Sequence, residues 1–239
     1  MVEFSIVLPV YNEEKRISKN IDVIFGFFNA IGRIVEIIFV NDGSVDLTAE
    51  VLKSYQKKYT FSVISYEINR GKGYAVRQGA LAAIGKWILF FDIDLATPLE
   101  TFYLLDEKIK NQPQEIIVCS RRMASSTIHM NESKVRTFLG VCFTKLSNLL
   151  VPGITDFTCG FKCFSKKAVE IIFPRARINR WGFDTELLYI AHLHALEIKQ
   201  IPVTWSHDPN SRVKVVKAII SSLKELLTMK INQWRGLYR

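Results

Sequence analysis

The sequence predicts an α/β fold: one domain in which helices flank a Rossmann-like, mostly parallel central sheet. Short apolar runs typical of buried strands alternate with helical segments through the first half of the chain. Polar clusters follow several of these runs, as expected where parallel strands end at a ligand site. The chain has 239 residues and is 49% hydrophobic, which is enough for one large core.

The elements of the first half follow from apolar periodicity and turn signals. We expect strands at 4–10, 34–40, 61–66, 87–91 and 116–119. One helix is expected to follow the first strand and to end near residue 30. Three more are expected at 46–59, 74–84 and 98–110, the last with Pro98 in its first turn. This alternation predicts parallel pairing through right-handed crossovers.

The second half is less regular. Residues 120–133 are polar and predict an irregular segment. Helices are expected at 134–151, 166–173 and 183–194, and short strands at 160–164 and 198–205. A final helix should run from 213 to about 234. We expect one continuous fold, because no linker or low-complexity stretch separates the halves.

Two aspartates close the strand predicted at 87–91. Asp92 and Asp94 are spaced i, i+2, so their side chains should point to the same side of the strand end. Paired carboxylates repel each other unless a cation lies between them, and Mg²⁺ or Mn²⁺ prefers such oxygen ligands together with substrate phosphates. The plain alternative is two solvated aspartates at a strand end.

Three other polar clusters accompany this pair. Residues 9–13 and 41–44 end predicted strands, and residues 69–73 begin a helix with two glycines and a lysine. Each could be an ordinary turn by itself. Because parallel strand ends meet at one sheet edge, the clusters together predict a nucleotide pocket in which the helix start favours an anion.

Charge and cysteine content narrow the class further. The net charge is +9, which suggests an anionic partner such as a nucleotide, a phospholipid surface or a nucleic acid. No signal peptide and no apolar stretch of spanning length is recognisable, which predicts a cytosolic protein with reduced cysteines. The cysteines are Cys119, Cys142, Cys159 and Cys163.

A family resemblance rests on these clusters and on further motifs. In the first half the motifs are Pro9-Val10-Tyr11-Asn12-Glu13-Glu14, Val40-Asn41-Asp42-Gly43-Ser44 with Asp46 and Thr48, Asn69-Arg70-Gly71-Lys72-Gly73, and Asp92-Ile93-Asp94. In the second half they are Ser120-Arg121, Arg136, Asp156-Phe157-Thr158-Cys159-Gly160-Phe161-Lys162, and Arg180-Trp181-Gly182-Phe183-Asp184 with Glu186-Leu187-Leu188. The chain resembles the family 2 glycosyltransferases of GT-A fold, in particular their polyprenyl-phosphate branch, and is most similar to dolichyl-phosphate β-glucosyltransferases.

The resemblance implies metal-dependent, inverting transfer of a hexose from a nucleotide sugar to a polyprenyl phosphate, dolichyl or undecaprenyl. It implies a nucleotide-sugar-binding half at 1–122, an acceptor-binding half at 123–212 and a basic amphipathic helix at 213–239. The catalytic residues implied are Asp94, Arg121 and Arg136, of which the two arginines would receive the acceptor phosphate. The implied donor-binding residues are Pro9, Tyr11, Asn12, Glu13, Val40, Asp42, Lys72, Asp92, Ile93, Arg212 and Lys214. The metal ligands would be Asp92 and Asp94.

One departure from the family pattern bears on the donor. The mannosyl branch usually has Gln two residues after the second aspartate, where this chain has Ala96, as the glucosyl branch does. The resemblance therefore favours UDP-glucose, with GDP-mannose as the alternative. The acceptor phosphate is already an anionic nucleophile, so we expect arginines to orient it without a dedicated general base.

The last helix predicts a membrane location. Apolar residues recur at helical spacing, and residues 212–239 contain seven Lys and Arg against one acidic residue, Glu225. This pattern is typical of a helix lying on a membrane surface, although packing against the core is an equal alternative. We expect the protein to be peripheral on the cytosolic face of a membrane, where it would meet its lipid directly or through a membrane-protein partner.

Two other classes fit less well. A nucleotidyltransferase would show a glycine-rich basic signature near residue 10, where this chain has Pro9-Val10-Tyr11-Asn12. A nucleic-acid-binding protein would match the net charge, but no helix-turn-helix, zinc or RNA-recognition signature is present, so no nucleic-acid partner is expected.

Overall fold

A seven-stranded sheet extends through the chain and confirms the predicted fold class. The computed structural model describes residues 1–111, 115–128, 134–206 and 215–239, without the side chains of 134–136, 139 and 215–223. The strands are β1 (Phe4–Val10), β2 (Val35–Asp42), β3 (Ser62–Tyr66), β4 (Trp87–Phe90), β5 (Ile116–Ser120), β6 (Thr127–Ile128), β7 (Lys162–Ser165), β8 (Ile198–Pro202) and β9 (Thr204–Trp205). The helices are α1 (Glu14–Ala30), α2 (Thr48–Tyr55), α3 (Lys72–Ala82), α4 (Thr101–Asn111), α5 (Lys134–Ser147), α6 (Lys166–Ile172), α7 (Phe183–Leu193) and α8 (Val215–Trp234).

The main sheet has the order β3-β2-β1-β4-β7-β5-β8. All neighbouring pairs are parallel except those of β7, which runs antiparallel between β4 and β5. Lys162 of β7 pairs with Phe90 of β4 on one side and with Val118 of β5 on the other. A late segment thus joins two earlier strands, which makes the two predicted halves one sheet.

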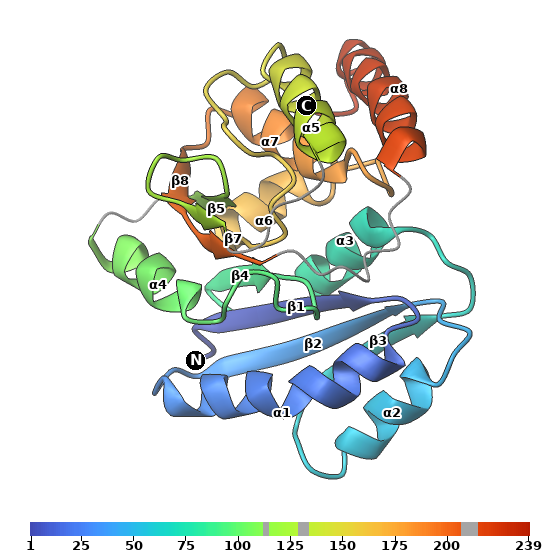
Figure 1. The fold of residues 1–239 in the computed structure, drawn as a ribbon, viewed down its shortest axis with the longest axis vertical. Coiled ribbons are helices and arrows are strands. Elements are labelled where there is room, and N and C mark those ends of the chain that lie inside the picture. The colour runs from blue at the N-terminus through green and yellow to red at the C-terminus, as the bar shows by residue number, and fades with distance from the viewer. Residues whose placement is uncertain (112–114, 129–133, 207–214) are drawn as a thin grey trace.

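Alternating apolar residues cover both faces of the sheet. In β1, Ile6 and Leu8 pack in the core beneath α1, whereas Val7 packs in the core beneath α3. Figure 1 shows α1 and α2 on one side of β1 and β2, with α3 on the other. Helix α3 lies so close to the sheet that a Cβ on Gly79 would be 2.3 Å from Val7 Cγ1. Burial on both faces explains why these strands are continuous apolar runs.

Several element ends differ from the sequence prediction. Helix α2 is shorter than 46–59, and α4 begins at Thr101 because 98–100 form a turn in which Thr101 N donates to Pro98 O. The strand expected at 198–205 is divided: β8 completes the main sheet, and β9 pairs with β6 in a separate two-stranded sheet. The four cysteines are unpaired in the structure, and Cys119, Cys159 and Cys163 are buried.

Helix α8 contacts the core and also exposes apolar side chains. Met229 is fully buried, and Glu225 Oε2 accepts a 2.7 Å hydrogen bond from Gly182 N at the start of α7. Leu227, Ile231 and Trp234 are exposed, Trp234 to 84%. The side of α8 that carries Met229 therefore packs on the core, and the membrane-surface alternative stays a prediction for the exposed side. Among the described residues, no helix combines the length and apolarity needed to cross a bilayer.

Candidate active site

The carboxyl ends of β1 and β2 are joined by hydrogen bonds between their polar clusters. Asn12 N donates to Ser44 Oγ at 2.9 Å, and Asn12 Oδ1 accepts from Val45 N at 2.9 Å. Asn12 has a φ of 55°, a left-handed conformation that asparagine tolerates better than most residues. Glu13 N donates to Thr48 Oγ1 at 2.9 Å. The structure thus brings together the first two clusters, as the parallel sheet predicted.

Asp42 holds residues 69–73, the polar cluster at the start of α3, at the same edge of the sheet. Its carboxylate accepts hydrogen bonds from Asn69 Nδ2, Arg70 N and Gly71 N at 2.8, 2.8 and 2.9 Å. Gly71 has a φ of 104°, a conformation that favours glycine, and α3 begins with the next residue. Asp42 is buried and braces this loop, so its expected contact with base or ribose would be an additional role.

Lys72, the first residue of α3, projects to the carboxylates after β4. Its Nζ lies 2.5 Å from Asp92 Oδ1. Burial would lower the pKa of Lys72, but the charges of Asp92 and Asp184 outweigh that effect and raise it. Burial, followed by the charge of Asp92, raises the pKa of Asp94. Asp94 therefore lies in partly buried surroundings beside a second carboxylate.

The backbone around the carboxylates is specialised. Leu95 has a φ of 54°, which is rare for a large side chain and typical of functional turns. Asp94 Oδ1 accepts from Ala96 N at 3.0 Å, which fixes its orientation. A Cβ on Gly160 would be 2.2 Å from Asp92 Oδ2, so only glycine fits where the segment before β7 passes Asp92. The segment from the second half thus closes one side of the site.

These residues fit a hard divalent cation that the substrate helps to hold. Asp92 and Asp94 supply carboxylate oxygens at one strand end, and burial, with repulsion from Asp92 as the second cause, raises the pKa of Asp94. Within the described residues no group of three or more His, Cys, Asp or Glu side chains gathers, and Ala96 offers no third ligand. Mg²⁺ commonly takes one or two carboxylates and completes its shell with phosphate and water.

A buried ion pair that the sequence prediction left without a role lies next to this cluster. Lys162 is fully buried, and its Nζ donates to Asp184 Oδ1 and to Cys159 O, each at 2.5 Å. Burial raises the pKa of Asp184, although the charges of Lys162 and Lys72 oppose the shift. The detectable signal in the sequence was a lysine inside an apolar strand run, since such a charge needs a partner.

Arg121 begins the loop after β5 and is held by Asp156. Its Nε and Nη2 lie 2.7 and 3.0 Å from the two carboxylate oxygens, and Nη2 also donates to Thr158 Oγ1 at 2.8 Å. Burial would raise the pKa of Asp156, yet the Arg121 charge and hydrogen bonds hold it well below its usual range. The guanidinium also lies over the Trp205 ring at 5.1 Å. Asp156 is thereby a structural partner of Arg121.

Some of the remaining predicted residues are described by the structure and some are not. Glu13 accepts from Arg16 Nη1 at 2.7 and 2.9 Å, while Tyr11 is 43% exposed beside it. Residues that support the site through the backbone or the core are Pro9, Val40 and Ile93. Arg136 belongs to α5, but its side chain lies outside the description. Arg212 and Lys214 lie outside the described residues.

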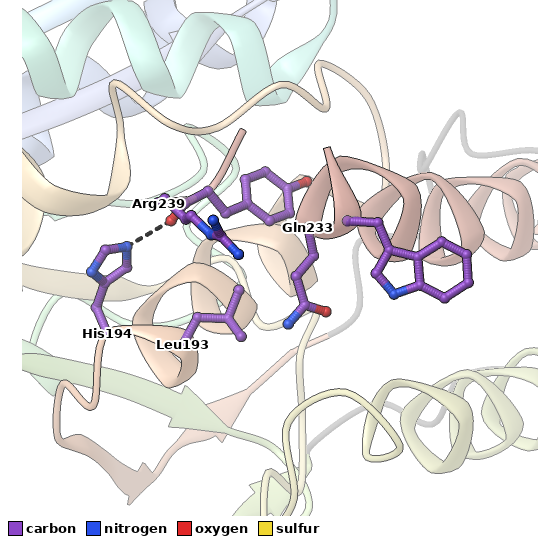
Figure 2. A pocket seen from close by; sticks show the side chains of 6 residues that line it. Leu193, His194, Gln233 and Arg239 are labelled. Atoms are coloured by element: carbon purple, nitrogen blue, oxygen red, sulfur yellow. Dashed lines mark hydrogen bonds between the residues drawn. The ribbon is translucent and has the colours of Figure 1, made fainter. Parts of the chain in front are cut away.

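A separate hollow near the chain end contains none of these residues. It has a volume of about 480 Å³ and is lined by the end of α7 and by residues from Gln233 onward. Figure 2 shows His194 directed at the Arg239 end of the chain, and its Nε2 lies 2.7 Å from Tyr238 O. Arg239 lines it, but no acidic side chain does among the described residues, so we assign it no chemistry.

The geometry can be compared with known proteins. The model of the family described as "Glycosyl transferase family 2" matches residues 5–173, which is most of the chain. The chain belongs to glycosyl transferase family 2. The predicted enzyme class is therefore confirmed: the protein is a glycosyltransferase. The match includes β1 to β7, and thus both aspartates and the Gly160 segment.

Relatives within this family align over nearly the whole chain. A dolichyl-phosphate beta-glucosyltransferase of Trichomonas vaginalis is 35% identical over 97% of this chain and 72% of its own. The human dolichyl-phosphate beta-glucosyltransferase is 34% identical over 99% and 78%, and that of Saccharomyces cerevisiae is 31% identical over 98% and 76%.

Solved structures confirm the GT-A type of fold. Glucosyl-3-phosphoglycerate synthase of Mycobacterium tuberculosis, crystallised with Mn²⁺, UDP and glucosyl-3-phosphoglycerate, is 21% identical with a TM-score of 0.70. The alignment covers 95% of this chain and 80% of that one. At this identity the likeness establishes the fold alone.

Proposed function

We propose that this chain transfers glucose from UDP-glucose to a polyprenyl phosphate, dolichyl or undecaprenyl, with inversion at the anomeric carbon. The observation that carries the proposal is the cluster of Asp92, Asp94 and Lys72 at the carboxyl edge of the sheet, with Arg121 at the end of β5, which β7 separates from β4. The names of the relatives support the acceptor and the sugar, because they are dolichyl-phosphate beta-glucosyltransferases.

The donor would lie along the ends of β1, β2 and β4. Tyr11 and Glu13 would contact the base and ribose, and the loop held by Asp42 leads into helix α3. Asp92 and Asp94 would hold Mg²⁺ or Mn²⁺, which when bound neutralises the charge that develops on the leaving diphosphate. Lys72 adds a fixed positive charge at the same place. Arg212 and Lys214 remain predicted donor contacts.

The acceptor would approach from the side of β5. Asp156 and Thr158 accept hydrogen bonds from Nε and Nη2 of Arg121, and this fixes the orientation in which Arg121 would present its positive charge to the acceptor phosphate. Arg136 is the predicted second phosphate contact. A phosphate oxygen is already charged near neutral pH, so the residues need only direct it at the anomeric carbon opposite the diphosphate. That in-line geometry would invert the configuration.

The lipid part of the acceptor requires a membrane nearby. Exposed apolar side chains lie on α8, at Leu227, Ile231 and Trp234, and also on and after α5, where Phe138 is 66% and Leu149 78% exposed. Figure 1 shows α5 and α8 together at one end of the molecule, and the two helices are in contact. Exposed lysines and arginines accompany them, namely Lys145, Lys224, Lys230 and Arg235. We propose that this end meets the cytosolic face of a membrane, directly or beside a membrane-protein partner.

A transfer assay tests the proposal. Purified protein is incubated with dolichyl or undecaprenyl phosphate, Mn²⁺ or Mg²⁺, and radiolabelled UDP-glucose, UDP-galactose, UDP-GlcNAc or GDP-mannose. We expect a lipid-linked product from UDP-glucose that contains β-linked glucose. Transfer from GDP-mannose in preference to UDP-glucose would contradict the donor, and activity that is unchanged in EDTA would contradict the metal.

Arg136 separates the acceptor side from the donor side. Arg136→Ala should raise the KM for polyprenyl phosphate and leave UDP-sugar binding nearly unchanged, because the two phosphates would occupy different walls of the site. Arg136→Lys should recover acceptor use only in part, since lysine cannot form the bidentate contact. Equal weakening of donor and acceptor binding would show that this division of the site is wrong.

A further inference from the structure

Five charged side chains form a row across the candidate active site. Lys162 contacts Asp184, and Lys72 contacts Asp92, each pair at 2.5 Å. The negative charge of Asp184 helps to raise the pKa of Lys72, although the two side chains belong to different pairs. Asp94 adds a second carboxylate beside Asp92. From Lys162 to Asp92 the charges alternate in sign, and Lys72 is influenced by a carboxylate of each pair.

The two carboxylates that influence Lys72 differ in how firmly they are held and how exposed they are. Asp184 is fixed by Lys162, a fully buried residue in a strand that is paired on both sides. Asp92 has a side chain 39% exposed at the open strand end, where a cation could reach it. Lysine has a flexible four-carbon stem and a point charge, so its ammonium can change partners without backbone movement.

Packing brings together the two helix starts that carry Lys72 and Asp184. A Cβ on Gly73 would be 2.4 Å from Phe183 Cβ, so the starts of α3 and α7 are in direct contact. Gly73 N also donates to Asn179 O at 2.9 Å. Lys72 and Asp184 each neighbour this contact in sequence. Gly160 crowds the other side, since a Cβ there would lie 3.6 Å from Lys72 Nζ.

A divalent cation on Asp92 would share that carboxylate with the ammonium of Lys72, and two cations so close repel each other. We propose that Lys72 exchanges Asp92 for Asp184 when Asp92 takes a divalent cation, and that Asp184 is a positioning residue which keeps the lysine beside the donor diphosphate. This inference rests on the metal site in the proposed function and adds a competition between Lys72 and the metal.

Mn²⁺ binding without nucleotide tests the exchange directly. The affinity is measured by electron paramagnetic resonance of free Mn²⁺ and by calorimetry, so no turnover is needed. Lys72→Met removes the competing ammonium and should tighten Mn²⁺ binding about tenfold, equivalent to about 1.4 kcal/mol. The same variant should weaken binding of UDP with Mn²⁺ present, because the diphosphate loses a positive contact. Lys86→Met, an exposed lysine at the opposite end of β4, is the matched control and should change neither.

Asp184→Asn should act in the opposite direction. The lysine loses its second partner and stays on Asp92, so Mn²⁺ binding should weaken about tenfold. The amide oxygen of the asparagine can still accept a hydrogen bond from Lys162, and Lys162 also keeps its hydrogen bond to Cys159 O. The variant should therefore fold, which circular dichroism and thermal unfolding can check. The double variant Lys72→Met/Asp184→Asn should bind Mn²⁺ as tightly as Lys72→Met alone, because Asp184 acts through Lys72.

The outcomes distinguish this inference from the proposed function. If the wild-type protein binds no Mn²⁺, with or without UDP, the metal site itself is wrong. If it binds Mn²⁺ and Lys72→Met leaves that affinity unchanged or weaker, the competition is refuted. If Asp184→Asn weakens binding equally in the presence and absence of Lys72, Asp184 acts on the metal by its own charge and is not a positioning residue for the lysine. If Asp184→Asn does not fold, the opposite effects of Lys72→Met on Mn²⁺ and UDP still decide the competition.

Discussion

At the scale of single residues, Asp94 is the most direct test of the metal site. Asp94→Asn preserves the size of the side chain and its acceptor oxygen for Ala96 N, but removes the charge that would bind a cation. Transfer should fall by about 10²-fold or more, as for the loss of a key electrostatic stabiliser. The thermal unfolding midpoint should not fall, since removing one charge relieves repulsion from Asp92. Wild-type turnover in this variant would exclude Asp94 as a ligand.

Arg121 has a structural as well as a proposed catalytic role. Arg121→Ala would leave Asp156 buried without its partner, so the free energy of unfolding should fall by about 3–5 kcal/mol. Urea denaturation at pH 7 measures this loss. Because the pair lowers the pKa of Asp156, its stabilisation is present above the usual pKa near 3.9 and is lost as pH falls through the lower native value. The deficit of the variant should therefore shrink below about pH 4.

Activity of that variant must be compared with Arg121→Lys, which keeps a charge beside Asp156 but not the paired N–H groups. We expect Arg121→Lys to retain most of the stability while transfer to the polyprenyl phosphate stays impaired. Full activity in Arg121→Lys would show that transfer does not need the guanidinium of Arg121.

The sequence indicated most site residues but not how they share charge. Asp92 and Asp94 were recognisable because a buried strand ends in them, and parallel strand ends meet at one edge. The Asp156–Arg121 and Lys162–Asp184 pairs were not, because each joins positions at least 22 residues apart. Periodicity reports which face a residue occupies, whereas such pairing depends on how distant segments pack.

At the scale of elements, α8 can be tested face by face. Changing Leu227, Ile231 and Trp234 to glutamine removes exposed apolar surface without touching the buried side. The triple variant should stay folded and bind anionic vesicles at least tenfold more weakly in a flotation assay, because each of these side chains contributes to burial in the interface. It should also lose activity on long polyprenyl phosphates more than on a short soluble analogue.

Two controls belong to this experiment. Val23→Gln removes an exposed apolar side chain from α1, away from α5 and α8, and should leave vesicle binding unchanged. Met229→Ala alters the buried face of α8 and should cost about 2–5 kcal/mol of stability. If the triple variant binds vesicles as well as the wild type, the apolar face of α8 serves something other than lipid.

The structure also changes how the end of the chain can be tested. Tyr238 is buried, and its Oη is hydrogen-bonded to Glu186 in α7. Removing residues 219–239 would therefore open the core, and loss of membrane binding in such a truncation would not separate lipid contact from unfolding. Amphipathicity in the sequence could not resolve this, because a helix with a buried stripe and a lipid-facing stripe has the same spacing as either alone.

At the scale of the molecule, the halves depend on each other. In the main sheet β5 pairs with β7 and β8, and β4 pairs with β1 and β7. A fragment of residues 1–122 would leave both β5 and one edge of β4 unpaired. It should be aggregated or unfolded when expressed alone, as judged by gel filtration and circular dichroism. A monomeric fragment with cooperative unfolding would show that the nucleotide half is an independent domain.

The antiparallel strand β7 has a consequence for synthesis of the protein. A ribosome delivers β5 before β7, and roughly 40 residues separate them. At about 5–20 residues per second, the nascent chain presents an open apolar edge on β4 for several seconds. The last β-pairings are then made between segments distant in sequence, which is intrinsically slow. A chaperone that shields strand edges on the nascent chain would therefore raise the yield of this enzyme most when translation pauses between residues 120 and 162.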